Sequence, residues 1–307
     1  MSKKRVAISI GDLNGIGIEI ALKAHKQISK IVKPIYIIDK DMLKQASKLL
    51  NLEIPKDFKT ISPEAKKFKI KPGTVSKKSG KYSFLSFLKA INLAQSKKVD
   101  AIVTLPINKE AWEKAKLSYV GHTDFLRLHL KEEAIMMLGC PKMYVALYTE
   151  HIPLKEVPKE IKIKKLTKFL LDLQNSIKSK SKIAVLGLNP HAGDNGVLGS
   201  EEKSITKAIN LANKKLQTKL FVGPIVPDIA FTPNFRKNFK YFVALYHDQG
   251  LAPLKALHFD ESINVSLNLS ILRSSVDHGT AFDIAYKNGN PKIKSYINAV
   301  KYVAKAK

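Results

Sequence analysis

The sequence predicts an α/β protein built on a mainly parallel, doubly wound sheet. Short apolar runs of strand length alternate along the chain with longer stretches in which apolar residues recur at helical spacing. The strand-like runs are apolar almost throughout, which is typical of strands that are covered on both faces. Strands that alternate with helices indicate parallel strand pairs joined by helical crossovers. The 307 residues contain no internal repeat and no low-complexity linker, and this length is long for one domain but short for three.

The first elements of the chain follow this pattern. Residues 5–10 form the first predicted strand, and the glycine-rich residues 11–17 lead into a helix. Glycines in such a turn let the backbone approach a ligand, and the helix N-terminus favours anions. The dinucleotide fingerprint G-x-G-x-x-G is not matched, because its last position is occupied by Ile20. Residues 35–39 are predicted as the second strand and residues 40–52 as the next helix.

A long amphipathic helix and a possible anion site follow. Residues 82–97 carry an apolar stripe at helical spacing, and residues 100–105 form a strand. Asn108 follows this strand, and a helix start is the preferred interpretation of its position. Another helix is predicted to open at His122 and Thr123, where Thr123 is placed to cap it. The sequence leaves two interpretations of this helix N-terminus open, a phosphate-binding site or simple capping.

Three predicted strands each run into a histidine. The strands are residues 142–149, 182–188 and 241–245, and the histidines are, in the same order, His151, His191 and His247. Ligands of open α/β sheets bind beyond the carboxyl ends of the strands. Three imidazoles without a thiolate suit zinc, cobalt, nickel or iron, and three protein ligands leave a position for substrate. From the residues alone, a shared metal site and three unrelated loop histidines remain equally open.

The last third of the chain contains several isolated polar residues. Lys255 follows His247 within a predicted helix, and Asp228 follows a short strand as either a loop carboxylate or an acid–base group. Asn264 and Arg273 interrupt two extended segments. The remaining helices are predicted at residues 155–176, at residues 199–214, from residue 279 onward and at residues 291–304.

Composition limits the class of protein. The formal net charge is +27, but only four of the basic residues are arginines, whereas base-edge and bidentate phosphate recognition favour arginine. Lysines spread over helix faces are interpreted as a solvated surface that attracts anionic substrates. The single cysteine, Cys140, excludes an intramolecular disulfide, and no apolar run approaches the roughly 20 residues that span a bilayer. These features predict a cytoplasmic protein that binds neither membrane nor nucleic acid.

Four sequence blocks together resemble one enzyme family. They are Gly-His-Thr-Asp at 121–124, Leu-Asn-Pro-His-Ala-Gly at 188–193 with Gly-Ser-Glu-Glu at 199–202, Tyr-His-Asp-Gln-Gly at 246–250, and Asp-His-Gly-Thr-Ala-Phe-Asp-Ile-Ala at 277–285. Their order and content resemble the 4-hydroxythreonine-4-phosphate dehydrogenase family of vitamin B6 biosynthesis, from Ile8 to Ala285. The chain departs from the family pattern at three positions, with Leu13 and Ile18 where the family usually has proline and Tyr286 where it usually has glycine.

The resemblance implies an architecture and an assembly. The family is similar in fold to the isocitrate and isopropylmalate dehydrogenase superfamily, which implies two α/β lobes. Residues 1–120 and 270–307 would form one lobe, and residues 121–269 the other. The family also implies a homodimer whose active site lies at the subunit interface, with NAD or NADP and one divalent metal ion (Zn, Mg or Co) as cofactors.

The resemblance further implies the reaction and the roles of single residues. The reaction would be the oxidation of 4-phosphooxy-L-threonine and its decarboxylation to 3-amino-1-hydroxyacetone 1-phosphate. The implied metal ligands are His151, His191 and His247. The implied substrate-binding residues are His122, Thr123, Lys255, Asn264 and Arg273, and the loop that faces the nucleotide contains Asp277, His278, Gly279, Thr280 and Asp283. Asp228 or Lys255 is the predicted proton acceptor.

Two alternatives remain open at this point. One is a related metal-dependent dehydrogenase of another phosphorylated hydroxy acid, such as 4-phosphothreonate or 4-phosphoerythronate. The other belongs to a different class, a basic nucleic-acid-binding protein on an enzyme-like scaffold, for which a steep salt dependence of DNA binding would be diagnostic.

Overall fold

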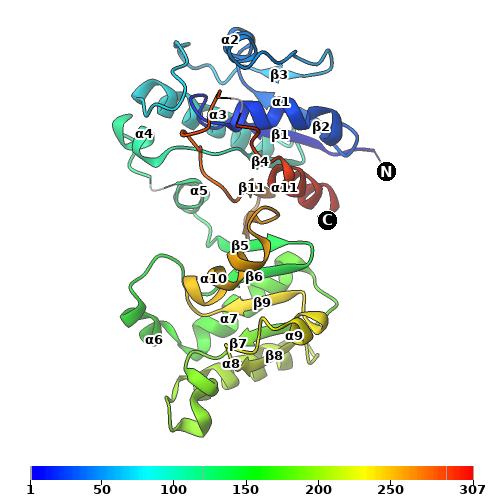
Figure 1. The fold of residues 1–307 in the computed structure, drawn as a ribbon. Helices are drawn as coiled ribbons and strands as arrows, with labels where there is room; N and C mark the ends of the chain where they lie inside the picture. The colour runs from blue at the N-terminus through cyan, green and yellow to red at the C-terminus, as the bar shows by residue number, and fades with distance from the viewer. Residues whose placement is uncertain (1, 120, 288, 307) are drawn as a thin grey trace. The chain divides into compact units, whose positions relative to one another are not determined.

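The computed structural model describes residues 2–119, 121–287 and 289–306. The chain divides into two compact units, whose helices and strands are labelled in Figure 1. The first unit comprises Met1–Glu132 and Ile263–Lys307, and the second comprises Glu133–Ser262. The first unit is therefore assembled from two separate stretches of chain, whereas the second is continuous.

The sheet of the first unit has the strand order β3-β2-β1-β4-β11-β10. Neighbouring strands are parallel except for β10 and β11, which are antiparallel. Because β1 lies inside the sheet and the chain winds outward from it in both directions, this half of the fold is doubly wound, as predicted. The strands are β1 (Arg5–Ser9), β2 (Lys33–Ile37), β3 (Thr60–Ile61), β4 (Ala101–Thr104), β10 (Ile263–Leu267) and β11 (Arg273–Val276).

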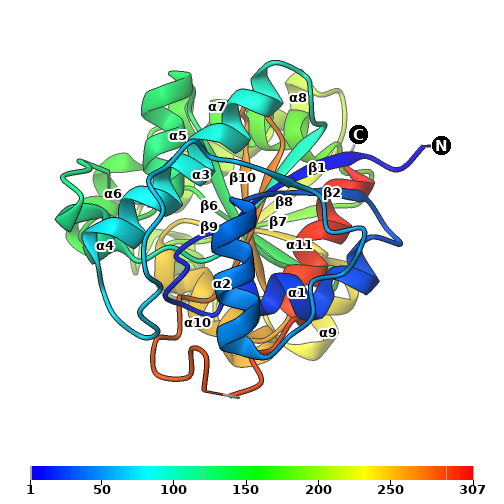
Figure 2. The same ribbon diagram turned by 90° about the horizontal axis from the view of Figure 1, so that it is seen from above.

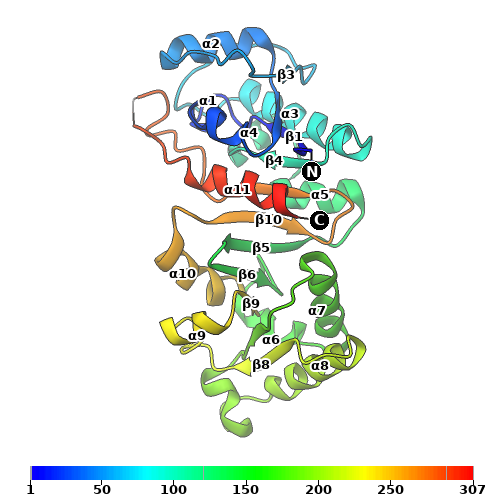
Figure 3. The ribbon, with the colours of Figure 1, turned by 90° about the vertical axis from the view of Figure 1, so that its right-hand side faces the viewer.

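Helices cover both faces of this sheet. α3 packs on β1, β2 and β4, while α1 and α11 pack together on the opposite face (Figures 2 and 3). The core on the α3 side is aromatic and includes Phe87, Trp112 and Phe125, all less than a tenth exposed. The helices are α1 (Gly17–Ile28), α2 (Lys40–Leu50), α3 (Lys77–Gln95), α4 (Lys109–Lys114), α5 (His122–Leu130) and α11 (Lys294–Lys305).

The second unit is a smaller α/β body with the strand order β5-β6-β9-β7-β8. β5 and β6 form an antiparallel hairpin, and the other neighbours are parallel. α10 packs on one face against β5, β6 and β9, and α7 packs with α8 on the other (Figure 3). The strands are β5 (Ile135–Cys140), β6 (Met143–Leu147), β7 (Ile183–Leu186), β8 (Phe221–Ile225) and β9 (Tyr241–Ala244). The helical segments are η1 (Leu154–Glu156), α6 (Val157–Glu160), α7 (Ile163–Ile177), η2 (Pro190–Gly196), α8 (Glu201–Lys215), α9 (Pro233–Asn238) and α10 (His247–His258).

The boundaries between the two units differ from those expected. Residues 121–132 and 263–269, which were assigned to the central lobe, belong to the first unit. α5 joins this unit because Phe125 is part of its aromatic core, and the Glu132 carboxylate accepts a hydrogen bond from the backbone N–H of Ser270 at 2.8 Å. β10 joins it because it pairs with β11 along most of its length.

Several local predictions can be compared with the elements. Asn108 caps α4 as expected, since its side-chain oxygen accepts a hydrogen bond from the N–H of Ala111 at 2.7 Å. The predicted cap at Thr123 is wrong, because the N-cap of α5 is Gly121 and Thr123 lies inside the helix. The helix expected from residue 279 is also wrong, since Ala281 has a positive φ of 43° within a series of turns. Within the described residues, no helix combines the length and the apolar character required to cross a membrane.

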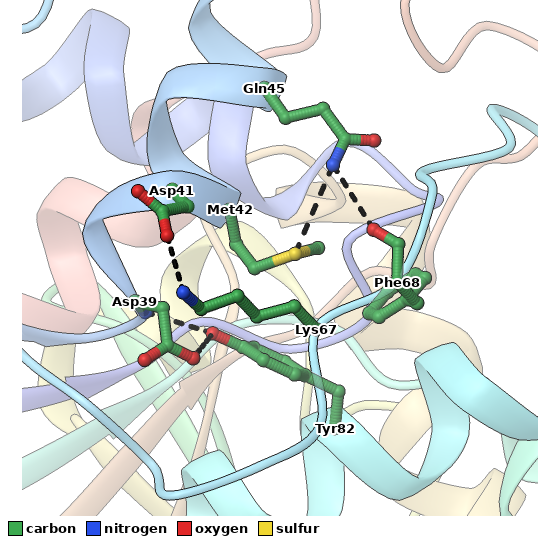
Figure 4. Close-up of polar contacts among 7 residues, drawn as sticks. All are labelled: Asp39, Asp41, Met42, Gln45, Lys67, Phe68 and Tyr82. Carbon is green, nitrogen blue, oxygen red and sulfur yellow. Dashed lines mark hydrogen bonds and ion pairs between the residues drawn. The ribbon is translucent and has the colours of Figure 1, made fainter.

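The segment at residues 53–76, which has little regular structure, is attached to the rest of the first unit by side-chain contacts (Figure 4). Gln45 on α2 donates a hydrogen bond to the carbonyl of Phe68 at 3.0 Å. Tyr82 on α3 donates its hydroxyl to the Asp39 carboxylate at 2.9 Å and accepts from the Asp39 N–H at 2.9 Å. These contacts hold the irregular segment to α2 and the start of α2 to α3.

Candidate active site

Two of the three strand-end histidines lie close together. His151 follows β6 and His247 opens α10 after β9, and these two strands are parallel neighbours. Thr149 continues the pairing past the end of the strands, because its hydroxyl donates to the carbonyl of Leu245 at 2.6 Å. The ring centroids of His151 and His247 are 5.4 Å apart. Sheet order therefore brings together two imidazoles that are separated by almost a hundred residues of sequence.

The first turn of α10 orients His247. Its Nδ1 lies 2.7 Å from a carboxylate oxygen of Asp248, and a proton on Nδ1 leaves the lone pair of Nε2 available to a metal. Gln249 accepts a hydrogen bond from the N–H of Leu245 at 2.7 Å and donates to the carbonyl of Gly187 at 2.6 Å. These bonds join the ends of β9 and β7 to the start of α10, so the first turn of the helix that carries His247 is held in place.

His191 lies on a third loop, which follows β7. It is exposed within η2, where His191, Ala192, Asp194 and Asn195 all have positive φ values between 41° and 56°. The buried carboxylate of Glu202 anchors the preceding loop by accepting the N–H of Asn189 at 2.8 Å. Among the described residues, His151, His191 and His247 do not form a set whose three ligand atoms lie within 4.8 Å of one another. The close approach that the structure describes is that of the His151 and His247 rings.

The donor chemistry of this pair fits a divalent metal ion. Two imidazoles at adjacent strand ends, one of them held by a carboxylate on its other nitrogen, form a typical partial site for a borderline cation. A third ligand is required to complete it. The residues that the structure brings together therefore fit the implied metal, and they would bind it through His151 and His247.

The first unit contains a buried guanidinium that has no acidic partner among the described residues. Arg273, at the start of β11, is only 2% exposed. Its Nε and Nη2 donate to the Thr104 hydroxyl at 3.2 and 2.7 Å, and its Nη1 donates to the Ser266 hydroxyl at 3.0 Å. Burial lowers the pKa of Arg273 to about 9, so the group remains protonated at pH 7. A buried cation whose described partners are hydroxyl groups favours an anionic ligand.

Two more predicted substrate residues belong to the same unit and each has an unpaired buried atom. The Nε2 atom of His122 and the Oδ1 atom of Asn264 are buried without hydrogen-bond partners. Burial is the main cause that holds the pKa of His122 well below its usual value of 6.5, and the positive charge of Arg273 is the smaller cause. His122 is therefore neutral at pH 7. Buried polar atoms are rarely left unpaired in proteins. The unpaired atoms of His122 and Asn264 are therefore suited to a polar ligand.

The structure places the remaining predicted residues as follows. Thr123 is buried in the first turn of α5. Lys255 is on α10, eight residues after His247, and its ammonium group lies 5.3 Å from the centre of the Phe259 ring. Asp228 is exposed in the turn after β8, and β7 separates β8 from β9 in the sheet. Lys255 therefore shares an element with a predicted metal ligand, whereas Asp228 does not.

The predicted nucleotide loop at residues 277–283 is packed against the glycine-rich turn at residues 11–17. The N–H of Ile16 donates to the carbonyl of Thr280 at 3.0 Å, and a Cβ at Gly15 would lie only 2.8 Å from the same oxygen. The small size of Gly15 therefore lets the turn support the loop, which holds Asp277, His278, Gly279, Thr280 and Asp283.

Two of the departures from the family pattern lie in this contact. The hydroxyl of Tyr286 donates to the carbonyl of Leu13 at 2.7 Å, and Leu13 is fully buried. Next to it, the buried carboxylate of Asp12 accepts hydrogen bonds from the N–H of Asn14 at 2.9 Å and the hydroxyl of Ser79 at 3.0 Å. Burial raises the pKa of Asp12 to about 6 despite these bonds. The turn and the loop thus form one connected network.

Comparison with known proteins now places the chain among its relatives. Residues 30–303 match the model of the pyridoxal phosphate biosynthetic protein PdxA family. The chain belongs to this family. It is 64% identical over 301 residues to a 4-hydroxythreonine-4-phosphate dehydrogenase of Sulfurimonas denitrificans, with 98% of this chain and 97% of that protein covered. It is 56% identical to a protein of the same name from Campylobacter fetus, with 99% of each chain covered.

The solved structures agree with this assignment. A crystal structure of a 4-hydroxythreonine-4-phosphate dehydrogenase from Burkholderia phymatum matches with a TM-score of 0.82 at 30% identity, over 99% of this chain and 98% of that one. The family predicted from the ordered motifs is thereby confirmed, as is a role in pyridoxal phosphate biosynthesis.

Proposed function

We propose that the chain is an NAD(P)-dependent dehydrogenase that oxidises 4-phosphooxy-L-threonine and releases carbon dioxide, giving 3-amino-1-hydroxyacetone 1-phosphate. Membership of the PdxA family and the names of its nearly full-length relatives support this activity. In the reaction, the hydride on the carbinol carbon passes to the nicotinamide and the hydroxyl proton passes to a protein base. The resulting β-keto acid loses its carboxylate as carbon dioxide, and the electron pair moves into the ketone to give an enolate. The enolate then takes up a proton at its amino-bearing carbon, which gives the aminoketone product.

The observation that carries the proposal is the buried charge of Arg273. A substrate with a phosphate and a carboxylate supplies the anion that the guanidinium lacks, and charge-assisted hydrogen bonds are the strongest of their kind. His122 and Asn264 would bind the same substrate through Nε2 and Oδ1, the atoms that are buried without partners. Neutral His122 can donate to a phosphate oxygen without adding a second buried charge.

We further assign the divalent metal, Zn, Co or Mg, to His151, His247 and His191. A bound metal ion would lower the pKa of the substrate hydroxyl and polarise the ketone that forms. Because the three ligand atoms are not all within 4.8 Å of one another among the described residues, the proposal assigns His191 to the second chain of a homodimer. The predicted sharing of the active site between two chains provides such a ligand.

Lys255 is the favoured proton acceptor of the two candidates. It lies on the helix that carries His247, and a neighbouring metal ion would favour its neutral, basic form. Asp228 is the second candidate, in the exposed turn after β8. The loop at residues 277–283 is assigned to the nucleotide, and the proposal includes the cytoplasmic location that the sequence predicts.

A substrate panel tests the proposal. The protein is incubated with NAD or NADP and with 4-phosphooxy-L-threonine, 4-phosphothreonate or 4-phosphoerythronate, and reduced nicotinamide is followed by absorbance. We expect the first substrate to have the highest kcat/KM and to release carbon dioxide. A clear preference for another acid would move the chain to the related activity. DNA binding with a steep salt dependence and no turnover of any substrate would support the basic binding protein instead.

A further inference from the structure

A second group of metal-binding side chains lies in the second unit, away from the histidine pair. It consists of Cys140, the last residue of β5, and of His258 and Glu261 at the end of α10. One ligand atom from each of the three lies within 4.8 Å of the others. His247 and His258 occupy opposite ends of α10, about 16 Å apart at 1.5 Å per residue. This group is therefore separate from the proposed catalytic ligands.

The backbone around Cys140 is closely constrained. Cys140 pairs with Met143 at the closed end of the β5–β6 hairpin and is fully buried. The preceding Gly139 has φ of 143°, and a Cβ there would lie 2.1 Å from the carbonyl of Met143, so only glycine fits. The position of the thiol is thus determined by the hairpin itself.

The two ligands from α10 are also held in place. The carbonyl of His258 accepts hydrogen bonds from the N–H groups of Glu261 at 3.2 Å and Ser262 at 3.1 Å, which closes the end of the helix. Leu251 and Leu254 of the same helix pack in one core cluster with β5 and β6. The hairpin and the end of α10 are therefore parts of a single packed body, and the three ligands approach one another without any movement of the backbone.

We propose that Cys140, His258 and Glu261 bind a zinc-like divalent cation that fastens the β5–β6 hairpin to the end of α10. Thiolate, imidazole and carboxylate are the three ligand types that zinc uses in proteins. Ligand atoms at zinc bond lengths stand roughly 3.5 Å from one another, so small side-chain rotations complete the site, with water or another group in the fourth position.

Metal binding competes with contacts that are already present. The ammonium group of Lys142 lies 3.6 Å from a carboxylate oxygen of Glu261, and His258 and Glu261 take part in further interactions. The thiol must also lose its proton, so binding weakens as the pH falls. Binding of a cation therefore has to displace the Lys142 contact of Glu261 as well as the proton of the thiol.

Cobalt provides a direct test because the chain has one cysteine. A thiolate bound to Co²⁺ gives a sulfur-to-metal charge-transfer band in the near ultraviolet, and a site made only of histidines gives none. The full-length protein is titrated with Co²⁺ and its bound metal is counted by elemental mass spectrometry. We expect the wild-type chain to show the band, Cys140→Ser to lose the band and one metal per chain while keeping turnover, and His247→Ala to keep the band.

Glu261→Gln is a second variant that keeps the proposal testable if Cys140→Ser fails to fold. It retains the thiol and the shape of the side chain but removes a charged ligand, and we expect it to weaken Co²⁺ binding at this site at least about tenfold. Two results would overturn the proposal. One is the absence of a charge-transfer band in folded wild-type protein loaded with Co²⁺, and the other is an equal metal count in the wild-type chain and Cys140→Ser. Neither result depends on turnover, so the proposed function is tested separately.

Discussion

Replacing Thr104 by valine tests how the buried guanidinium of Arg273 is held. The change keeps nearly the same volume and removes the hydroxyl that accepts from Nε at 3.2 Å and from Nη2 at 2.7 Å. A hydrogen bond to a charged group contributes about 1.5–3 kcal/mol, and a buried donor left unpaired adds a desolvation cost. The shorter bond, from Nη2, contributes most of this stabilisation, so we expect Thr104→Val to lower the free energy of unfolding by about 2–4 kcal/mol.

The chain provides its own reporter and controls for this measurement. Its single tryptophan, Trp112, is fully buried in the core of the same unit, so its fluorescence during urea unfolding follows the unit that contains Arg273. Ser266→Ala removes one acceptor of the guanidinium, and we expect a loss of about 1.5–3 kcal/mol. Ser275→Ala removes a neutral hydrogen bond, from the hydroxyl to the carbonyl of Thr104 at 3.1 Å, and we expect about 1 kcal/mol.

The comparison of Thr104→Val with Ser275→Ala decides whether the Thr104 hydroxyl stabilises the charge of Arg273. Suppose that Thr104→Val lowers the free energy of unfolding no more than Ser275→Ala does, while the slope of that free energy against urea concentration is unchanged. The Thr104 hydroxyl then does not stabilise the charge, and the reasoning about Arg273 fails. A rise in KM for the phosphorylated substrate with little change in kcat is expected alongside the stability loss, because the guanidinium would lose its orientation.

Four further predictions follow from the same structure. Arg273→Lys should raise KM at least about tenfold, because lysine cannot form a two-pronged contact with an oxyanion; an unchanged KM would assign the arginine a structural role. His191→Ala or His247→Ala should abolish turnover and lose the catalytic metal while circular dichroism stays native, and full metal content in either would contradict the three-histidine assignment. Mixed dimers of His191→Ala and His247→Ala chains should recover up to roughly a quarter of wild-type activity, since half the dimers are mixed and each has one intact site; inactive mixed dimers would contradict the assignment of the two histidines of one site to different chains. The folded state binds the proton of Asp12 more tightly than the unfolded state does, with a pKa of about 6 against 3.8. The contribution of Asp12 to stability is therefore present at acidic pH and is lost as the pH rises from about 4 to 6, and Asp12→Asn should remove about 1–3 kcal/mol of this pH dependence. Identical pH profiles of stability for the wild-type chain and the variant would argue against a shifted pKa.

The class of fold and part of the site were predictable because they depend on patterns that repeat along the chain. Alternating apolar runs and amphipathic stretches indicate a parallel sheet, and polar residues at strand ends indicate its functional edge. His151 and His247 meet because β6 and β9 are neighbours. His191 follows β7, which is also next to β9, but four left-handed residues shape its loop. His, Asp and Asn are enriched at positive φ, but this preference is too weak to predict a run of left-handed residues, and Ala192 has no such preference.

Other features could not be predicted because they arise from register between distant strands. Thr104 and Ser266 are ordinary strand residues in the sequence, and they become partners of Arg273 only because β11 pairs with β4 on one side and β10 on the other. The boundary near residue 132 could not be predicted for a similar reason, since the apolar residues of the helix before it could pack in either lobe. The network that joins Asp12 and Leu13 to residues 280 and 286 connects opposite ends of the chain, beyond the reach of local pattern.

The division of the first unit into two stretches imposes an order on biosynthesis. β4 emerges from the ribosome about 170 residues before β11, its eventual neighbour, which corresponds to a delay of about 9–35 s at typical bacterial elongation rates. During this interval the second unit, being continuous, can complete its fold. The buried strand β4 meanwhile has an unpaired edge, which is the kind of surface that nascent chains expose to aggregation and to chaperones. Translation speed through residues 133–262 is therefore a determinant of yield for this fold, and slowing it should lower the yield of native protein more than slowing the first hundred residues.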